Sequence, residues 1–185
     1  MSENQQQSGR AAYGKRVALG SDRYNSVLSH YYDEATMLDN MEFQAWGATL
    51  AQDLTYSVPI RHTRTMRDRE ADVVRSLQHY DDNYMSMMGR IMRFGGDSAF
   101  AEDPPSRIRR FVSNLQVFET DNENELNAVS YLLITRNRFD DDFFDLVPCE
   151  RHDLLRESDG TFMLAKREVI VDQSVIGTPN LAMFL

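Results

Sequence analysis

The sequence predicts an α+β fold in which three helices pack on one face of a curved, mostly antiparallel sheet. Apolar residues recur with the helical period of about 3.6 in the first half of the chain and with a period of about 2 in the second half. The chain has 185 residues, of which 42% are hydrophobic and 26% are charged. This composition is typical of one globular domain and excludes a chain that is disordered throughout.

Two helices are expected before residue 51. The first begins at Ser21 or Asp22, either of which can cap a helix, and ends at Asp39 and Asn40. Its apolar stripe consists of Val27, Leu28, Tyr31, Ala35 and Leu38. The second helix is short, and its apolar side chains are Phe43, Trp46 and Leu50. These positions are most simply interpreted as core.

A strand and a third helix are expected next. Residues 54–60 alternate between apolar and polar side chains, which predicts a strand with one buried face. Pro59 places that strand at an edge or an end. Residues 61–72 are polar and predict a loop. The third helix is expected from about Ala71 or later to Phe94, where the pair Gly95-Gly96 stops it.

The second half of the chain predicts a four-stranded meander. Its strands are expected at Arg107 to Phe118, Leu126 to Phe139, Phe143 to Glu157 and Phe162 to Val171. Polar turns separate them at residues 121–125, 140–142 and 158–160. Residues 21–185 are therefore expected to form one domain, preceded by a flexible, Gln-rich arm at residues 1–20.

Composition limits the classes of function. A net charge of −9 argues against nonspecific binding to nucleic acid, which needs a basic surface. The chain contains no apolar run of about 18 residues, and residues 1–10 are too polar for a secretory signal. A cytoplasmic protein that spans no membrane is the expectation. The single Cys149 excludes an internal disulfide and is expected to be a packed thiol.

The residues suggest no strong catalytic motif. The four histidines lack the spacing of a helical metal site, and no nucleophile elbow or phosphate-binding loop is present. Asp140, Asp141 and Asp142 could bind a cation but are more simply a solvated turn. A curved sheet closed by helices can still enclose a pocket for acid–base catalysis. Tyr56, Asn114 and Tyr131 are the strand residues that could line it.

One segment resembles a known family. Residues 102–114 read Glu-Asp-Pro-Pro-Ser-Arg-Ile-Arg-Arg-Phe-Val-Ser-Asn. This resembles a signature of the small (beta) subunits of Rieske-type aromatic-ring-hydroxylating dioxygenases. Similar motifs follow the family's order across about residues 24–185, at residues 43–46, 53–61, 150–156, 165–173 and 180–185. The chain departs at Arg110, Cys149 and His152, where the family usually has His, Gly and Arg.

The resemblance implies a cone-shaped fold of the nuclear-transport-factor-like (cystatin-like) type, shared with ketosteroid isomerase and scytalone dehydratase. It implies a hexamer of three large and three small subunits that dihydroxylates aromatic compounds. The catalytic large (alpha) subunit would hold the Rieske [2Fe-2S] cluster and the mononuclear iron, whereas the small subunit is mainly structural and holds no cofactor. One cysteine agrees with this, because a Rieske cluster needs two Cys and two His ligands.

A structural subunit is expected to use charged and apolar residues at subunit interfaces. The candidates are Glu102, Asp103, Arg107, Arg109, Arg110, Arg151, Asp153, Phe184 and Leu185. The rigid Pro104-Pro105 before Arg107 favours buried interface ion pairs over surface salt bridges. The alternative from another class is a stand-alone dehydratase or isomerase of the same fold, which would need a polar pocket and a titratable group with a shifted pKa.

Overall fold

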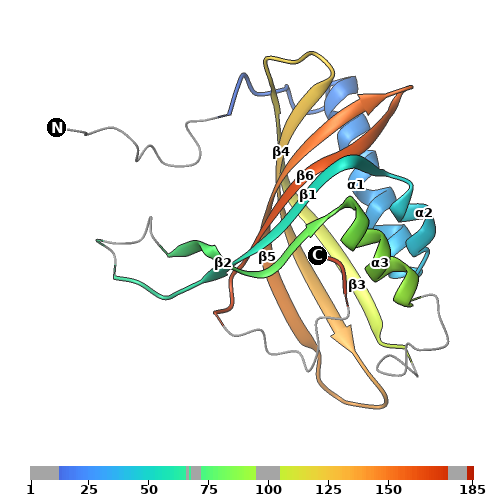
Figure 1. Ribbon diagram of the computed structural model, residues 1–185, viewed down its shortest axis with the longest axis vertical. Coiled ribbons are helices and arrows are strands. Elements are labelled where there is room, and N and C mark those ends of the chain that lie inside the picture. Colours follow the sequence, from blue (N-terminus) through green and yellow to red (C-terminus); the bar gives the residue numbers. More distant parts are fainter. Residues whose placement is uncertain (1–12, 66, 68–71, 95–104, 175–182) are drawn as a thin grey trace.

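A twisted six-stranded sheet forms the body of the protein (Figure 1). The computed structural model describes residues 13–65, 67, 72–94, 105–174 and 183–185. The strands lie in the order β2-β1-β6-β5-β4-β3. Their bounds are Leu50–Arg61 (β1), Val73–Asn83 (β2), Arg107–Glu119 (β3), Glu125–Asn137 (β4), Asp145–Ser158 (β5) and Thr161–Val171 (β6). Only the pair β1–β6 is parallel among these described strands, which confirms the mostly antiparallel sheet.

Three helices cover one face of this sheet (Figure 1). They are α1 (Asp22–Asp39), α2 (Phe43–Gly47) and α3 (Tyr84–Phe94). The Ser21 hydroxyl caps α1 by accepting a hydrogen bond from the backbone N–H of Tyr24 at 3.3 Å, as the sequence predicted. The hydrophobic core lies between helices and sheet and includes Tyr31, Trp46 and Leu132. No helix in the described ranges is long and apolar enough to cross a membrane.

Residues 73–83 form a strand, so the expected helix from about Ala71 is wrong in its first half, although α3 does end at Phe94. β2 pairs with β1, but the register shifts on both sides of Pro59. Pro59 lies opposite Gln78, whereas the next residue of β1 lies opposite Val74. Since proline offers no N–H to the ladder, β2 bulges at this point. The bulge interrupts the two-residue period by which a strand is predicted.

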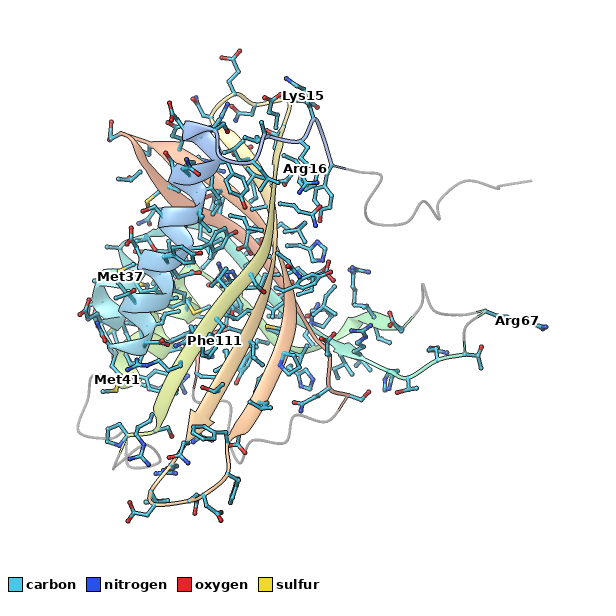
Figure 2. All side chains as sticks on the ribbon, turned by 180° about the vertical axis from the view of Figure 1, so that it is seen from behind. Lys15, Arg16, Met37, Met41, Arg67 and Phe111 are labelled. Carbon is cyan, nitrogen blue, oxygen red and sulfur yellow. The ribbon has the colours of Figure 1, made fainter. Side chains whose placement is uncertain are left out.

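Residues 13–20 of the predicted arm are fastened to the edge strand β3. The N–H of Val17 donates to the Val117 carbonyl and that of Glu119 donates to the Lys15 carbonyl, each at 2.8 Å. A Cβ at Gly14 would collide with the backbone carbonyl of Glu119, so a side chain there would displace this segment. Figure 2 shows Lys15 and Arg16 beside the end of the sheet. Residues 1–12 lie outside the described residues, and the flexible arm stays a prediction for them.

Candidate functional site

Four charged side chains lie in the interior, between α1 and the sheet. They are Glu34 from α1, Arg151 and Asp153 from β5, and Arg167 from β6, and each is at most 3% exposed. We call them the charge quartet. Alternate residues of a strand face the same side, so Arg151 and Asp153 point inward together with the core residues of β5.

Arg167 joins the two carboxylates of the quartet. Its Nη1 and Nη2 donate to the Glu34 carboxylate at 2.9 and 3.0 Å. Its Nε and Nη2 donate to the Asp153 carboxylate at 2.9 and 2.8 Å. Arg151 Nη1 donates to Glu34 Oε2 at 3.0 Å. Two carboxylates thus balance two guanidinium groups, which removes the net charge that burial would penalise most strongly.

Neutral side chains add hydrogen bonds to the quartet, although Arg151 Nη2 is buried without a hydrogen-bond partner. Trp46 Nε1 donates to Glu34 Oε1 at 3.1 Å, and the Tyr31 hydroxyl donates to Asp153 Oδ2 at 2.7 Å. Arg151 Nε donates to the Ser130 hydroxyl at 3.1 Å. The Arg151 guanidinium also lies 4.9 Å from the centre of the Tyr31 ring. The quartet therefore connects α1 and α2 with the three central strands β4, β5 and β6.

The pKa values of Glu34 and Tyr31 in this cluster lie far from neutral pH. Burial alone would raise the pKa of Glu34, but Arg167 and Arg151 outweigh it and hold that pKa well below its usual range. Burial and the adjacent Asp153 raise the pKa of Tyr31 well above its usual value. A general acid or base works best with a pKa near the operating pH. Glu34 and Tyr31 are instead built to keep one protonation state.

The segment 183–185, which we call the tail, fills the interior beside the quartet. Met183, Phe184 and Leu185 are 3%, 1% and 1% exposed. The Tyr56 hydroxyl and Arg167 Nη1 donate to the Leu185 carbonyl at 2.7 and 3.2 Å. Figure 1 shows the C-terminal end between the helices and the sheet. The tail thus occupies space in which the fold could otherwise hold a small molecule.

Of the three predicted pocket residues, only Tyr56 points into the interior. Its hydroxyl is used by the tail, because it also accepts the Leu185 N–H at 3.1 Å. Burial raises the pKa of Tyr56 to about 12, so the hydroxyl stays protonated at neutral pH. Asn114 is exposed at an irregularity of β3 with a φ of 52°, and Tyr131 faces the opposite side of the sheet. The structure therefore does not bring these three side chains together.

Five of the nine predicted interface residues lie inside the chain itself. Arg151 and Asp153 belong to the quartet, and Phe184 and Leu185 form the tail. Arg110 is 9% exposed, donates to Asp39 Oδ1 at 2.7 Å and donates to the Phe184 carbonyl at 2.7 Å. Arg110, Arg151 and Asp153 have ion-pair partners within the same chain, and an interface role for the five residues stays a prediction.

Two of the remaining predicted interface residues, Arg107 and Arg109, lie at the surface. Arg107 Nε donates to Asn137 Oδ1 at 3.2 Å, which ties β3 to β4. The Arg109 side chain is 69% exposed and lies 3.8 Å from Asp39. Glu102 and Asp103 lie outside the described residues. For Arg107 and Arg109 the interface role stays a prediction.

The sequence interpretation did not single out Glu34 or Arg167, which are the centre of the site. Arg167 lay within a recognised motif but received no role. Strand alternation offered a signal, since Arg167 shares its inward face with Val169 and Val171. Glu34 offered a similar signal, because it lies one helical turn after Tyr31 on the buried face of α1.

The described residues do not fit a Rieske cluster or a protein-held metal. They include no group of three His, Cys, Asp or Glu side chains placed to hold a metal ion. Cys149 is buried, its thiol lies 3.6 Å from the Leu132 carbonyl, and burial raises its pKa to about 12. A thiol in that setting is a poor metal ligand and a poor nucleophile.

Exposed apolar side chains gather at one end of the sheet, on β3, β4 and β5 and on the connection between β4 and β5. We call them the outer patch: Phe111, Leu133, Phe139, Phe143, Phe144 and Leu146, which are 37–62% exposed. The strand register brings the members on β3, β4 and β5 together. Phe111 of β3 lies opposite Leu133 of β4. Two residues further along β4, Thr135 lies between Arg109 of β3 and Leu146 of β5. Figure 2 shows Phe111 on β3, with Met37 of α1 and Met41, which follows the end of that helix, to one side of it. Exposed clusters of this kind mark interaction surfaces.

His30 makes the stability of the fold sensitive to acid. Burial lowers its pKa, although Glu34 opposes this, and its Nε2 is buried without a hydrogen-bond partner. Its ring packs edge-on against Tyr31 and Phe162 at 5.7 and 5.9 Å. Glu34, Arg167, Asp153 and Arg151 are the charged groups that act on it.

Because the pKa of His30 in the folded chain lies below its value of about 6.5 in the unfolded chain, the unfolded chain takes up the proton first as the pH falls. The contribution of neutral His30 to the free energy of unfolding is therefore complete above about pH 6.5 and is lost below it. The loss is about 1.4 kcal/mol for each unit by which the folded and unfolded pKa values differ. We expect the free energy of unfolding, measured in urea, to depend less on pH between about pH 7 and pH 5 in the His30→Leu variant than in the wild type. The exposed His62→Leu variant is the control, and an equally steep profile in His30→Leu would contradict this prediction.

Comparison with known proteins agrees with the geometry. The family model described as "Ring hydroxylating beta subunit" matches residues 33–178. The beta subunit of biphenyl 2,3-dioxygenase from Rhodococcus jostii (strain RHA1) is 38% identical over 164 residues, which are 86% of this chain and 87% of that one. The beta subunit of benzene 1,2-dioxygenase from Pseudomonas putida is 37% identical over 174 residues, which are 92% of both chains.

The fold has a close counterpart among solved structures. A structure of naphthalene 1,2-dioxygenase with indole bound in its active site matches with a TM-score of 0.76 and 21% sequence identity. The match covers 90% of this chain and 89% of that chain. At this identity the likeness concerns the fold.

Proposed function

The chain belongs to the family of ring-hydroxylating beta subunits, and from this membership we propose that it supports assembly of an aromatic-ring-hydroxylating dioxygenase without holding a catalytic site itself. Its fold is the expected cone of the nuclear-transport-factor-like type. The alternative, a stand-alone dehydratase or isomerase, is not favoured by these relatives. In this proposal the present chain stabilises the assembly and its partner carries the catalytic site.

The observation that carries the proposal is the filled interior. A pocket enzyme of this fold would need a titratable group and room for a substrate. In this chain the charge quartet and the tail occupy that interior and are hydrogen-bonded to each other through Arg167 and the Leu185 carbonyl. Glu34 and Tyr31 are held away from the protonation states that proton transfer uses. These features suit a rigid structural element.

The partner is a large catalytic subunit, and we infer a hexamer of three large and three small subunits. We place the Rieske cluster and the mononuclear iron in the large subunit, as membership of the family implies. The described residues of this chain include no group of side chains placed to hold a metal ion. The names of the relatives point to benzene- or biphenyl-like hydrocarbons as the substrate class of the whole enzyme.

We assign the outer patch to the contact with the large subunit. Arg107 and Arg109 flank the patch on β3, so the two predicted interface cations border an apolar surface of the same chain. An apolar centre with a charged rim is the usual composition of an interface. Glu102 and Asp103 remain candidates for the same contact or for contacts between small subunits.

Co-expression with the large subunit of a ring-hydroxylating dioxygenase tests the proposal. We expect a brown complex with equal numbers of both chains, a mass that fits three of each, and iron in the large subunit. Arg107→Ala is expected to weaken assembly, whereas Arg64→Ala, an exposed arginine on the β1–β2 connection, is the control. A colourless, iron-free oligomer of this chain alone with turnover of its own would overturn the proposal.

A further inference from the structure

The backbone of the tail is held by side chains from three different strands. Tyr56 of β1 and Arg167 of β6 bind the Leu185 carbonyl, and Arg110 of β3 binds the Phe184 carbonyl. The Leu185 N–H donates to the Tyr56 hydroxyl at 3.1 Å. Side-chain donors that converge on two carbonyl groups resemble the way in which a protein binds a separate ligand.

The Phe184 ring is enclosed by other aromatic rings. Its centre lies 4.6 Å from that of Trp46, 5.4 Å from that of Phe94 and 5.5 Å from that of Phe43. The Arg90 guanidinium lies 5.0 Å from the same ring centre. Edge-to-face and tilted rings at such distances, together with a cation near the ring face, form a specific environment for one aromatic ring.

Charge decides which ligands suit this environment. Arg90 pairs with Asp82 at 2.6 Å and Arg110 pairs with Asp39 at 2.7 Å, while Arg167 pairs within the quartet. Because each of these guanidinium groups already has a carboxylate partner, an anionic ligand would add an unbalanced buried charge. A neutral aromatic molecule would not.

We propose that the interior of the cone is a binding site for one small neutral aromatic molecule and that Phe184 occupies it as a tethered ligand. The tail closes the site in the native chain, because its Leu185 carbonyl accepts a hydrogen bond from the Tyr56 hydroxyl and its Phe184 ring packs against Trp46. The inference does not depend on the proposed assembly function, because it concerns this chain alone.

Ligand binding by the full-length Phe184→Ala chain tests the inference, with toluene as the probe and benzoate as the charged control. Trp46 is the only tryptophan of the chain and touches the Phe184 ring, so its emission reports occupancy. We expect the variant to unfold at a lower temperature than wild type. We also expect toluene to raise that temperature saturably and to bind the variant at least tenfold more tightly than wild type.

Two comparisons make the test decisive. Phe111→Ala removes an exposed phenyl ring from the outer patch and should not gain toluene binding. If Phe184→Ala does not fold, Phe184→Leu retains most of the packing and is measured in its place. The proposal would be overturned if the variant bound toluene no more tightly than wild type does. It would also be overturned if benzoate raised the unfolding temperature of the variant as much as toluene does.

Discussion

We expect Glu34→Gln to lower the free energy of unfolding by about 3–5 kcal/mol, the usual cost of removing one partner of a buried ion pair. The substitution keeps the shape of the side chain but leaves Arg151 and Arg167 with one carboxylate, Asp153, between them. The interior would then carry an uncompensated positive charge. Trp46 would also lose a charged acceptor for its indole N–H.

Urea unfolding at neutral pH measures this effect, and Glu123→Gln is the matched control. Glu123 is exposed, and its side chain has no partner that a glutamine would lose among the described contacts. We expect a change of less than about 0.5 kcal/mol in the control. A loss below about 1 kcal/mol in Glu34→Gln would mean that water or relaxation compensates the charge, contrary to the role we give to the quartet.

Phe111→Glu is expected to weaken binding of the large subunit by at least about 30-fold, which corresponds to about 2 kcal/mol at an interface hot spot. Phe111 lies in the outer patch beside Leu133, and burial of a glutamate there against a partner would cost desolvation. Thermal unfolding of the isolated chain should change little, because the side chain is 55% exposed.

Co-purification at graded concentrations, with analytical ultracentrifugation of the product, measures that loss. Leu77→Glu is the control, because Leu77 is 54% exposed on β2, at the other edge of the sheet. Equal loss in both variants would point to general destabilisation. Loss of self-association with retained binding of the large subunit would reassign the outer patch to a contact between small subunits.

Local signals predicted most of the fold because local physics controls it. Ser21 caps α1 through its own side chain, and Asp159 and Gly160 adopt the positive φ values that a tight turn between β5 and β6 requires. The period-2 pattern after residue 106 located all four strands of the meander to within a few residues. Each of these features depends on neighbours in the sequence.

β2 could not be predicted in the same way. Its apolar residues Val73, Val74, Leu77 and Tyr80 have a spacing that also suits a helix, and the bulge opposite Pro59 leaves Leu77 exposed. Pairing with β1 outweighs this local pattern. Strand propensity depends strongly on the partner strand, so a bulged edge strand gives a weak signal in the sequence.

The sequence by itself determined the α+β class, both ends of α1, the end of α3, the meander and the family, since caps, turns, alternation and motif order are all local or linear properties. Only the tertiary structure decided where the charges go. Glu34 and Arg167 are 133 positions apart and Tyr56 and Leu185 are 129 apart, yet each pair is hydrogen-bonded in the interior. An inward-facing charge such as Arg151 suits a subunit interface as well as a core. Its identity as a core residue follows from a carboxylate that folding brings to it, because buried charge is tolerated only beside its partner.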